Sequence, residues 1–166
     1  MRTDIRREQP EDAPSIRRVH EAAFESSTEA SIVERLRAAG AVSLSLVAEQ
    51  DAELVGHILF SPVTIEGVPV RAVGLAPMAV GPAAQRRGVG SRLVRAALEE
   101  LRDRGYEIVV VVGHPAYYPR FGFVRASELG LRWEHSCPDE AFMALELRPG
   151  ALAGRSGLVR YRPELG

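Results

Sequence analysis

A basic segment with three glycines, lying between an apolar run and an amphipathic run, carries the residue types best suited to chemistry. It reads AVGPAAQRRGVGSRLV and covers residues 79–94. If a helix begins near Gly88, the unpaired N–H groups of its first turn can bind an anion. Gly88 and Gly90 leave room for a phosphate to approach the backbone, and Arg86 and Arg87 add positive charge beside it. The alternative is an ordinary connection with two solvated arginines.

Two familiar phosphate-binding motifs do not match this segment. A dinucleotide fingerprint needs G-x-G-x-x-G, but Leu93 stands where the third glycine belongs. A nucleoside-triphosphate loop needs G-x-x-x-x-G-K-[ST], and the sequence contains no lysine. The pattern that remains is Q-x-x-G-x-G over residues 85–90.

The spacing of apolar residues predicts the elements that position this pattern. Apolar residues three and four apart indicate amphipathic helices, whereas alternating or continuous apolar runs indicate strands. We expect helices over residues 10–24, 29–40 and 88–104, and strands over residues 3–7, 42–49, 54–63, 68–80, 107–112, 140–148 and 157–161. Residues 107–112 are apolar on both faces, which is typical of a covered, parallel strand. The sequence therefore predicts an α/β fold with a mostly antiparallel sheet and one βαβ unit over residues 75–112.

Two motifs together resemble a known family. Q-x-x-G-x-G between a strand and an amphipathic helix is similar to the acyl-CoA-binding motif of the GNAT superfamily of N-acetyltransferases. Tyr118 stands four residues before Gly122 and Phe123, as in the family's Y-x-x-x-G-F segment. The resemblance runs over residues 5–147, and GHILFSPV and FMALEL are similar to a poorly characterised bacterial branch of acetyltransferases. It implies a GNAT-like fold, with a splayed strand pair and helices on both faces of a mixed sheet.

The resemblance also implies acetyl-CoA as co-substrate and a set of residues that contact it. The backbone of residues 78–80 is expected to pair with the pantetheine arm, and the N–H groups of residues 85–91 are expected to hold the pyrophosphate. The implied contacts are Met78, Ala79, Val80, Gln85, Arg86, Arg87, Gly88, Val89, Gly90 and Ser91.

The implied reaction is direct transfer of the acetyl group to an amine. Backbone N–H near Val80 stabilises the oxyanion, and the Tyr118 hydroxyl protonates the CoA sulfur. A ring that only packs the cofactor is the alternative for Tyr118. His57 and His114 are the candidates for the general base, although His57 could equally pack against a helix. The segment that carries His114 is shorter than the family's commonest form and lacks its asparagine, which leaves that role open.

The acceptor is expected to be an amine of a small molecule or of a protein terminus. Residues 24–31 and 133–142 are the candidate rims of its pocket, with helix capping and a solvated loop as the respective alternatives. A module that binds acyl-CoA for sensing and has lost transfer is the alternative function.

Length and composition limit the other possibilities. The 166 residues predict one domain, residues 1–166, with a core over residues 5–147 and a C-terminal extension over residues 148–166. The formal charge of −1 gives no broad basic face for nucleic acid. One cysteine, Cys137, and the lack of ligand spacing predict no disulfide and no metal. No secretion signal or membrane span is apparent, so we expect a cytoplasmic protein, and family resemblance favours a homodimer.

Overall fold

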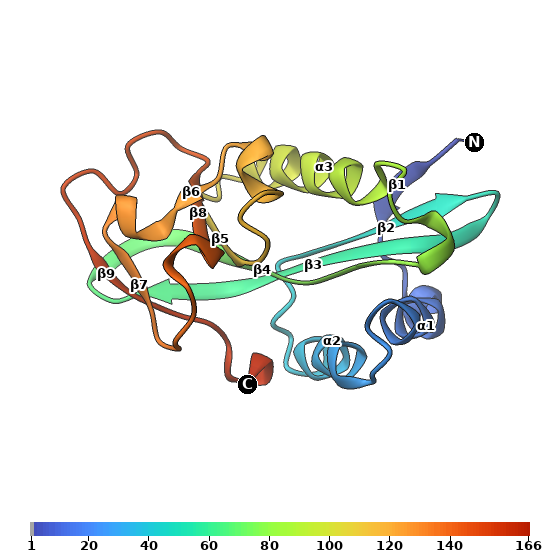
Figure 1. Cartoon of the computed structure of the whole chain (residues 1–166). Coiled ribbons are helices and arrows are strands. Elements are labelled where there is room, and N and C mark those ends of the chain that lie inside the picture. Colours follow the sequence, from blue (N-terminus) through green and yellow to red (C-terminus); the bar gives the residue numbers. More distant parts are fainter. Residues whose placement is uncertain (1) are drawn as a thin grey trace.

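A mixed sheet with helices on both faces forms the framework of the computed structural model, which describes residues 2–166 (Figure 1). The helices are α1 (Ala13–Phe24), α2 (Thr28–Ala38) and α3 (Val89–Asp103). The strands are β1 (Asp4–Arg7), β2 (Leu44–Gln50), β3 (Glu53–Ile65), β4 (Val68–Val80), β5 (Ile108–Val112), β6 (Val124–Arg125), β7 (Leu131–Trp133), β8 (Phe142–Glu146) and β9 (Gly157–Arg160). Main-chain pairing gives the order β1-β2-β3-β4-β5-β8-β6, with β9 paired to β3 and β7.

The first four strands form an antiparallel meander. β3 and β4 are the long pair, and they meet at a tight turn in which Gly67 has a φ of 77°. Such a positive φ favours glycine because a Cβ would be strained there. The long pair spans the width of the molecule in Figure 1.

The predicted βαβ unit is confirmed. α3 follows β4, and β5 returns parallel to β4. Helix α3 packs on one face of the sheet because its apolar stripe, which includes Leu93, Ala97 and Leu101, is fully buried against Ile58 and Phe60 of β3.

The opposite face of the sheet is covered by α1 and α2. Ile16 of α1 and Leu36 of α2 pack against Val47 and Leu59. Because side chains alternate along a strand, Leu59 and His57 point to this face, whereas Ile58 and Phe60 point to α3. The fold prediction, an α/β mixed sheet with helices on both faces, is confirmed.

The C-terminal residues return across the molecule to α2. Thr64 of β3 pairs with Arg160 of β9, and Arg35 of α2 donates a hydrogen bond to the Glu164 carbonyl at 3.0 Å. Leu165 packs against the apolar residues between α2 and the sheet. The sequence predicted a strand near β9 but not this return. Within the described residues, no helix combines the length and the apolar character needed to cross a bilayer.

Candidate functional site

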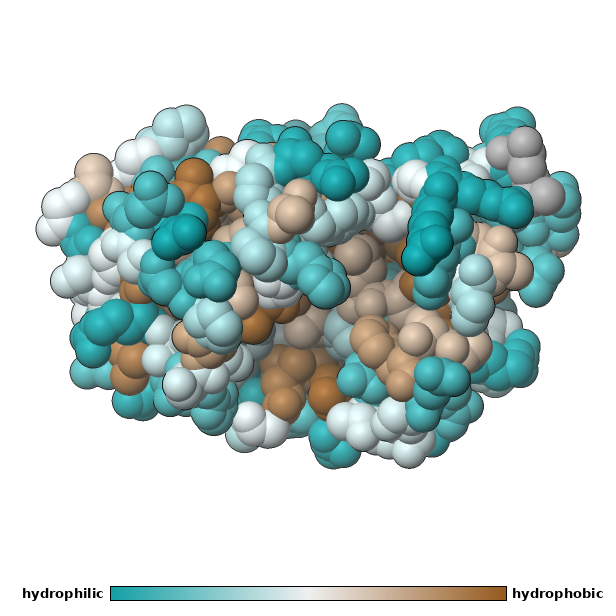
Figure 2. Space-filling view, viewed as in Figure 1, coloured by the Kyte–Doolittle hydropathy of each residue, from teal (hydrophilic) through white to brown (hydrophobic). Residues whose placement is uncertain are grey.

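A cleft of about 1090 Å³ opens where β4 and β5 diverge. Residues 72–74 of β4 pair with residues 108–110 of β5, whereas β4 continues to Val80 with β3 on its other edge. Figure 2 shows a hollow near the centre of this face, where apolar side chains gather between α3 on one side and α1 and α2 on the other. The predicted splayed strand pair is the origin of the cleft.

The end of the cleft at which an anion is expected lies at the start of α3. Arg86 and Gly88 both adopt left-handed backbone, with φ of 64° and 82°, and α3 begins at Val89. The Gln85 side chain donates a hydrogen bond to the Val80 carbonyl at 2.8 Å. This bond holds the loop against the end of β4, so the first-turn N–H groups of α3 face the cleft.

The residues expected to contact CoA line the cleft with two exceptions. Those that line it are Met78, Val80, Gln85, Arg86, Gly88, Val89, Gly90 and Ser91. Ala79 has its side chain buried, and Arg87 faces a neighbouring hollow beside α1. Ala79 can offer only its backbone, and Arg87 lies outside the cleft.

Tyr118 lies on the β5 side of the cleft, in a short 3-10 turn over Tyr118–Phe121. Its side chain is 7% exposed. Burial, and to a smaller extent Tyr117, raises the pKa of Tyr118 to about 12, so the hydroxyl keeps its proton at neutral pH. A Cβ at Gly113 would lie 2.5 Å from Tyr118 Cε2. Gly113 is therefore what lets the ring close over the end of β5.

Tyr117 is a cleft residue that sequence reasoning passed over. Its hydroxyl lies 3.1 Å from Ser91 Oγ, which joins the 3-10 turn to the start of α3. A Cβ at Gly90 would lie 3.3 Å from the same hydroxyl. The only signal in the sequence for Tyr117 was that it directly precedes Tyr118, the tyrosine that matches the family motif.

The two candidate histidines lie in different places. His114 is exposed and lines the cleft with Tyr118. His57 is fully buried beneath α1 and does not line the cleft. The structure therefore brings His114 to Tyr118. It does not bring His57 there, because side chains alternate along β3 and the His57 side chain points toward α1.

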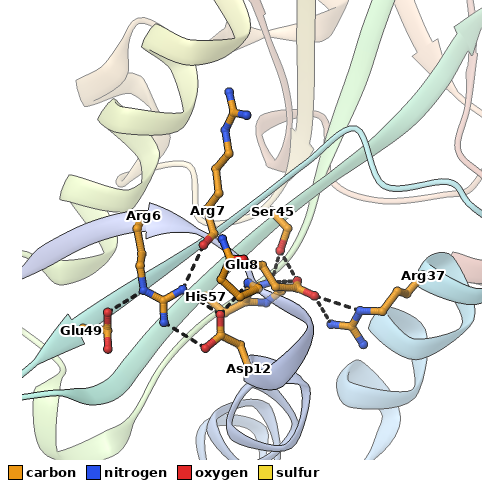
Figure 3. Close-up of polar contacts among 9 residues, drawn as sticks. Arg6, Arg7, Glu8, Asp12, Arg37, Ser45, Glu49 and His57 are labelled. Carbon is orange, nitrogen blue, oxygen red and sulfur yellow. Dashed lines mark hydrogen bonds and ion pairs between the residues drawn. The ribbon is translucent and has the colours of Figure 1, made fainter.

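His57 belongs to a hydrogen-bonded chain that we call the buried cluster, made of Glu8, Ser45, His57 and His20; Figure 3 labels the first three of these. Ser45 donates to the Glu8 carboxylate. Ser45 Oγ must then accept from His57 Nε2, 2.8 Å away, and His57 Nδ1 accepts from His20 Nε2, also at 2.8 Å. One set of tautomers thus satisfies every contact in the chain.

Burial and pairing shift the pKa values of the buried cluster. Burial lowers the pKa of His57, and the nearby Glu8 carboxylate offsets only part of that effect. Burial, followed by the neighbouring His57, lowers the pKa of His20 to about 3. Burial alone would raise the pKa of Glu8, but its contacts with His57, Ser45 and Arg37 lower it to about 2. Both rings are therefore neutral and the carboxyl is ionised at neutral pH.

Of the two candidate rims of the acceptor pocket, one lines the cleft and the other does not. Phe24 and Glu29, from residues 24–31, line the cleft. Residues 133–142 do not line it: Trp133 stacks on Phe142 and packs against Tyr161 instead. Leu165 lines the cleft as well, although its distance from the motifs gave no signal in the sequence.

Comparison with known proteins identifies relatives along the whole chain. Residues 4–126 match the family model described as an acetyltransferase (GNAT) domain. The chain is 40% identical over 158 residues to the uncharacterized N-acetyltransferase YhbS of Escherichia coli strain K12, with 95% of each chain covered. It is 39% identical over 154 residues to the uncharacterized N-acetyltransferase YjhQ of the same strain, covering 86% of this chain and 84% of YjhQ.

Solved structures agree with this match. The crystal structure of YhbS from Escherichia coli in complex with CoA gives a TM-score of 0.95 at 39% identity, covering 99% of this chain and 92% of that one. A GNAT family acetyltransferase from Brucella melitensis in complex with acetyl-CoA gives a TM-score of 0.84 at 39% identity, covering 99% of each chain. The chain therefore belongs to the GNAT family of N-acetyltransferases, as its Q-x-x-G-x-G and Y-x-x-x-G-F segments predict.

Proposed function

We propose that this chain transfers the acetyl group of acetyl-CoA directly to an amine of a small molecule or a peptide terminus, with Tyr118 as general acid. The observation that carries the proposal is the single cleft, which joins the start of α3 to Tyr118 through the gap between β4 and β5. The complexes of YhbS with CoA and of the Brucella melitensis protein with acetyl-CoA support the choice of donor.

The donor site follows from the backbone. The first-turn N–H groups of α3 and the Arg86 guanidinium attract the pyrophosphate, which Gly88 and Gly90 allow to approach. Residues 75–80 of β4 lie beyond the ladder to β5, so their free edge can pair with the pantetheine amides. The thioester then lies deeper in the gap, near Tyr118.

The chemical step needs a group that donates a proton to the leaving CoA sulfur. The neutral amine attacks the thioester carbonyl, a tetrahedral oxyanion forms, and the C–S bond breaks. A Tyr118 hydroxyl with a raised pKa remains protonated through the neutral range and can donate that proton as the thiolate leaves. The nitrogen loses a proton as the amide forms, and this proton restores Tyr118.

Calorimetric titration and a turnover assay test the proposal together. Acetyl-CoA and CoA are expected to bind saturably and NAD is not. Tyr118→Phe is expected to lower amine-dependent turnover about 100-fold or more while leaving acetyl-CoA affinity within about twofold. Tyr117→Phe is the matched control, because it removes the neighbouring hydroxyl, which already contacts Ser91. Binding without amine-dependent turnover would instead support an acyl-CoA-sensing module.

A further inference from the structure

Glu29 gives the cleft a negative charge on the side away from the pyrophosphate loop. It lies in the first turn of α2, and it is the one carboxylate among the described residues that line the cleft. The cationic side chains of the cleft, Arg86 and Arg120, come instead from the loop before α3 and from the Tyr118 turn. The α2 side of the cleft and the side formed by the loop before α3 and the Tyr118 turn therefore differ in charge.

One oxygen of Glu29 is buried without a partner. Oε1 is shielded from solvent and has no hydrogen-bond partner among the described residues. A carboxylate oxygen without a donor costs free energy when it is removed from water, so a native site of this kind calls for a partner group. A donor from a bound molecule would supply the missing hydrogen bond.

The surroundings of Glu29 define the kind of molecule that fits. Phe24, Ile32 and Leu165 line the cleft beside it, and Phe24 is 41% exposed. A cation with an apolar body would pair its charge with Glu29 and cover these side chains. An acidic or strongly hydrophilic acceptor would leave these apolar side chains exposed to water.

From these contacts we propose that Glu29 binds the ammonium of the acceptor and takes its proton, and that the acceptor is a primary amine on an apolar aliphatic or aromatic body. This inference rests on the proposed function. The ammonium gives one proton to the Glu29 carboxylate, and the neutral nitrogen attacks the thioester. The carboxyl group then returns that proton to solvent, while Tyr118 supplies the proton on the CoA sulfur.

The test compares Glu29→Gln with Glu34→Gln. Glu34 is on the same helix, half exposed, paired with Arg17 and outside the cleft, so it serves as the matched control. Hexylamine and phenethylamine are the apolar probes, and ethanolamine is the hydrophilic one. Acetyl-CoA affinity, measured by calorimetry, reports whether each variant is folded, and Glu29→Asp is the conservative rescue.

For the apolar amines, Glu29→Gln is expected to lower kcat/KM about 100-fold with acetyl-CoA affinity unchanged, and Glu29→Asp is expected to restore part of it. Activity of Glu29→Gln should rise with pH more steeply than that of the wild type, because unprotonated amine then becomes abundant. A purely structural role of Glu29 in α2 would not produce this pH profile. Equal activities of Glu29→Gln and Glu34→Gln, or a preference for ethanolamine, would overturn the inference.

Binding of hexylammonium to the CoA-loaded protein separates this inference from the proposed function. If the wild type binds hexylammonium, Glu29→Gln does not, and neither acetylates it, the assignment of Glu29 as the ammonium site stands and transferase activity fails. If hexylamine is acetylated equally by both proteins, the transferase stands and the role of Glu29 fails. If the CoA-loaded wild type does not bind hexylammonium, the Glu29 assignment is wrong.

Discussion

The cleft and the buried cluster both bring ionisable side chains together, but they differ in how those side chains are paired. In the buried cluster, His20 donates to His57, His57 donates to Ser45, and Ser45 donates to Glu8. Of the nitrogen and oxygen atoms of these side chains, only His20 Nδ1 has no hydrogen-bond partner among the described residues. In the cleft, His114 is exposed, and Glu29 Oε1 has no partner in the part of the chain that the structure describes. Polar groups that satisfy one another stabilise the fold, whereas polar groups left open beside a cavity are available to a ligand.

The two candidate histidines differ in their surroundings in the same way. We propose that His57 holds α1 and β1 to the sheet through His20, Ser45 and Glu8, and that His114 belongs to the catalytic surroundings. The two residues are of the same type and differ in their place in the fold: His57 lies within β3, whereas His114 lies in the loop after β5. Substitutions in each region can test this division.

The largest effect is expected from Gly113→Ala. The new Cβ would lie 2.5 Å from Tyr118 Cε2, so the ring must move out of the cleft. Misplacing a catalytic group by about 1 Å can cost about 100-fold in rate, and we expect a loss of that size in kcat at saturating acetyl-CoA. Gly81→Ala is the control, because its Cβ would meet only the Val55 carbonyl, at 3.6 Å. Full activity of Gly113→Ala would show that turnover does not depend on the observed position of the Tyr118 ring.

The second effect is on stability. His57→Leu leaves Ser45 and His20 without their shared partner in a fully buried site. The free energy of unfolding should fall by about 2 kcal/mol, measured by urea denaturation, with turnover within about twofold of wild type at low temperature. Loss of turnover without loss of stability would show that His57 acts in catalysis and not in stabilising the fold.

Acid pH should destabilise the protein through the buried cluster. The pKa of His20 is lowered to about 3 in the folded protein, so between that pH and about 6.5 the unfolded chain binds a proton that the native one does not. Stability is therefore complete above pH 6.5 and falls as the pH drops, by about 1 kcal/mol from pH 7 to 5.5.

The pKa of Glu8 is lowered to about 2, so Glu8 also reduces the stability as the pH falls, but only below the ordinary pKa of a glutamate. Urea midpoints across pH 5 to 8 measure the combined effect. A flat profile in the wild type would contradict neutral burial of His20.

The smallest effect is expected from His114→Ala. With Glu29 as the proton acceptor, removal of the exposed His114 should lower kcat/KM less than about tenfold and change the free energy of unfolding by less than about 0.5 kcal/mol. Steady-state kinetics with hexylamine measures this. A loss as large as that of Glu29→Gln would make His114 the base.

The loop before α3 and the turn that carries Tyr118 were predictable from the sequence because their determinants are local. The positive φ values of Arg86 and Gly88, the start of α3 and the turn that carries Tyr118 all lie within short stretches of chain with strong patterns. The splayed strand pair followed from the family resemblance, and the limited ladder between β4 and β5 bears it out.

The wall of the cleft opposite α3 was predictable only in part. Residues 24–31, which include Glu29, were a candidate rim in the sequence, and Phe24 and Glu29 line the cleft. Leu165 gave no signal, because it meets the cleft only after the C-terminal return has packed against α2. The face to which His57 turns depends on the register of β3 and on the helix that covers it. The short strands β6 and β7 carry too few residues for a period to be visible.

The most direct test of the transferase is the release of CoA thiol from acetyl-CoA with and without hexylamine. We predict release that requires both the protein and the amine, produces N-acetylhexylamine by mass spectrometry, and falls about 100-fold in Tyr118→Phe. Saturable acetyl-CoA binding with no amine-dependent release, across hexylamine, phenethylamine and ethanolamine, would contradict transfer and leave a module that only binds acyl-CoA.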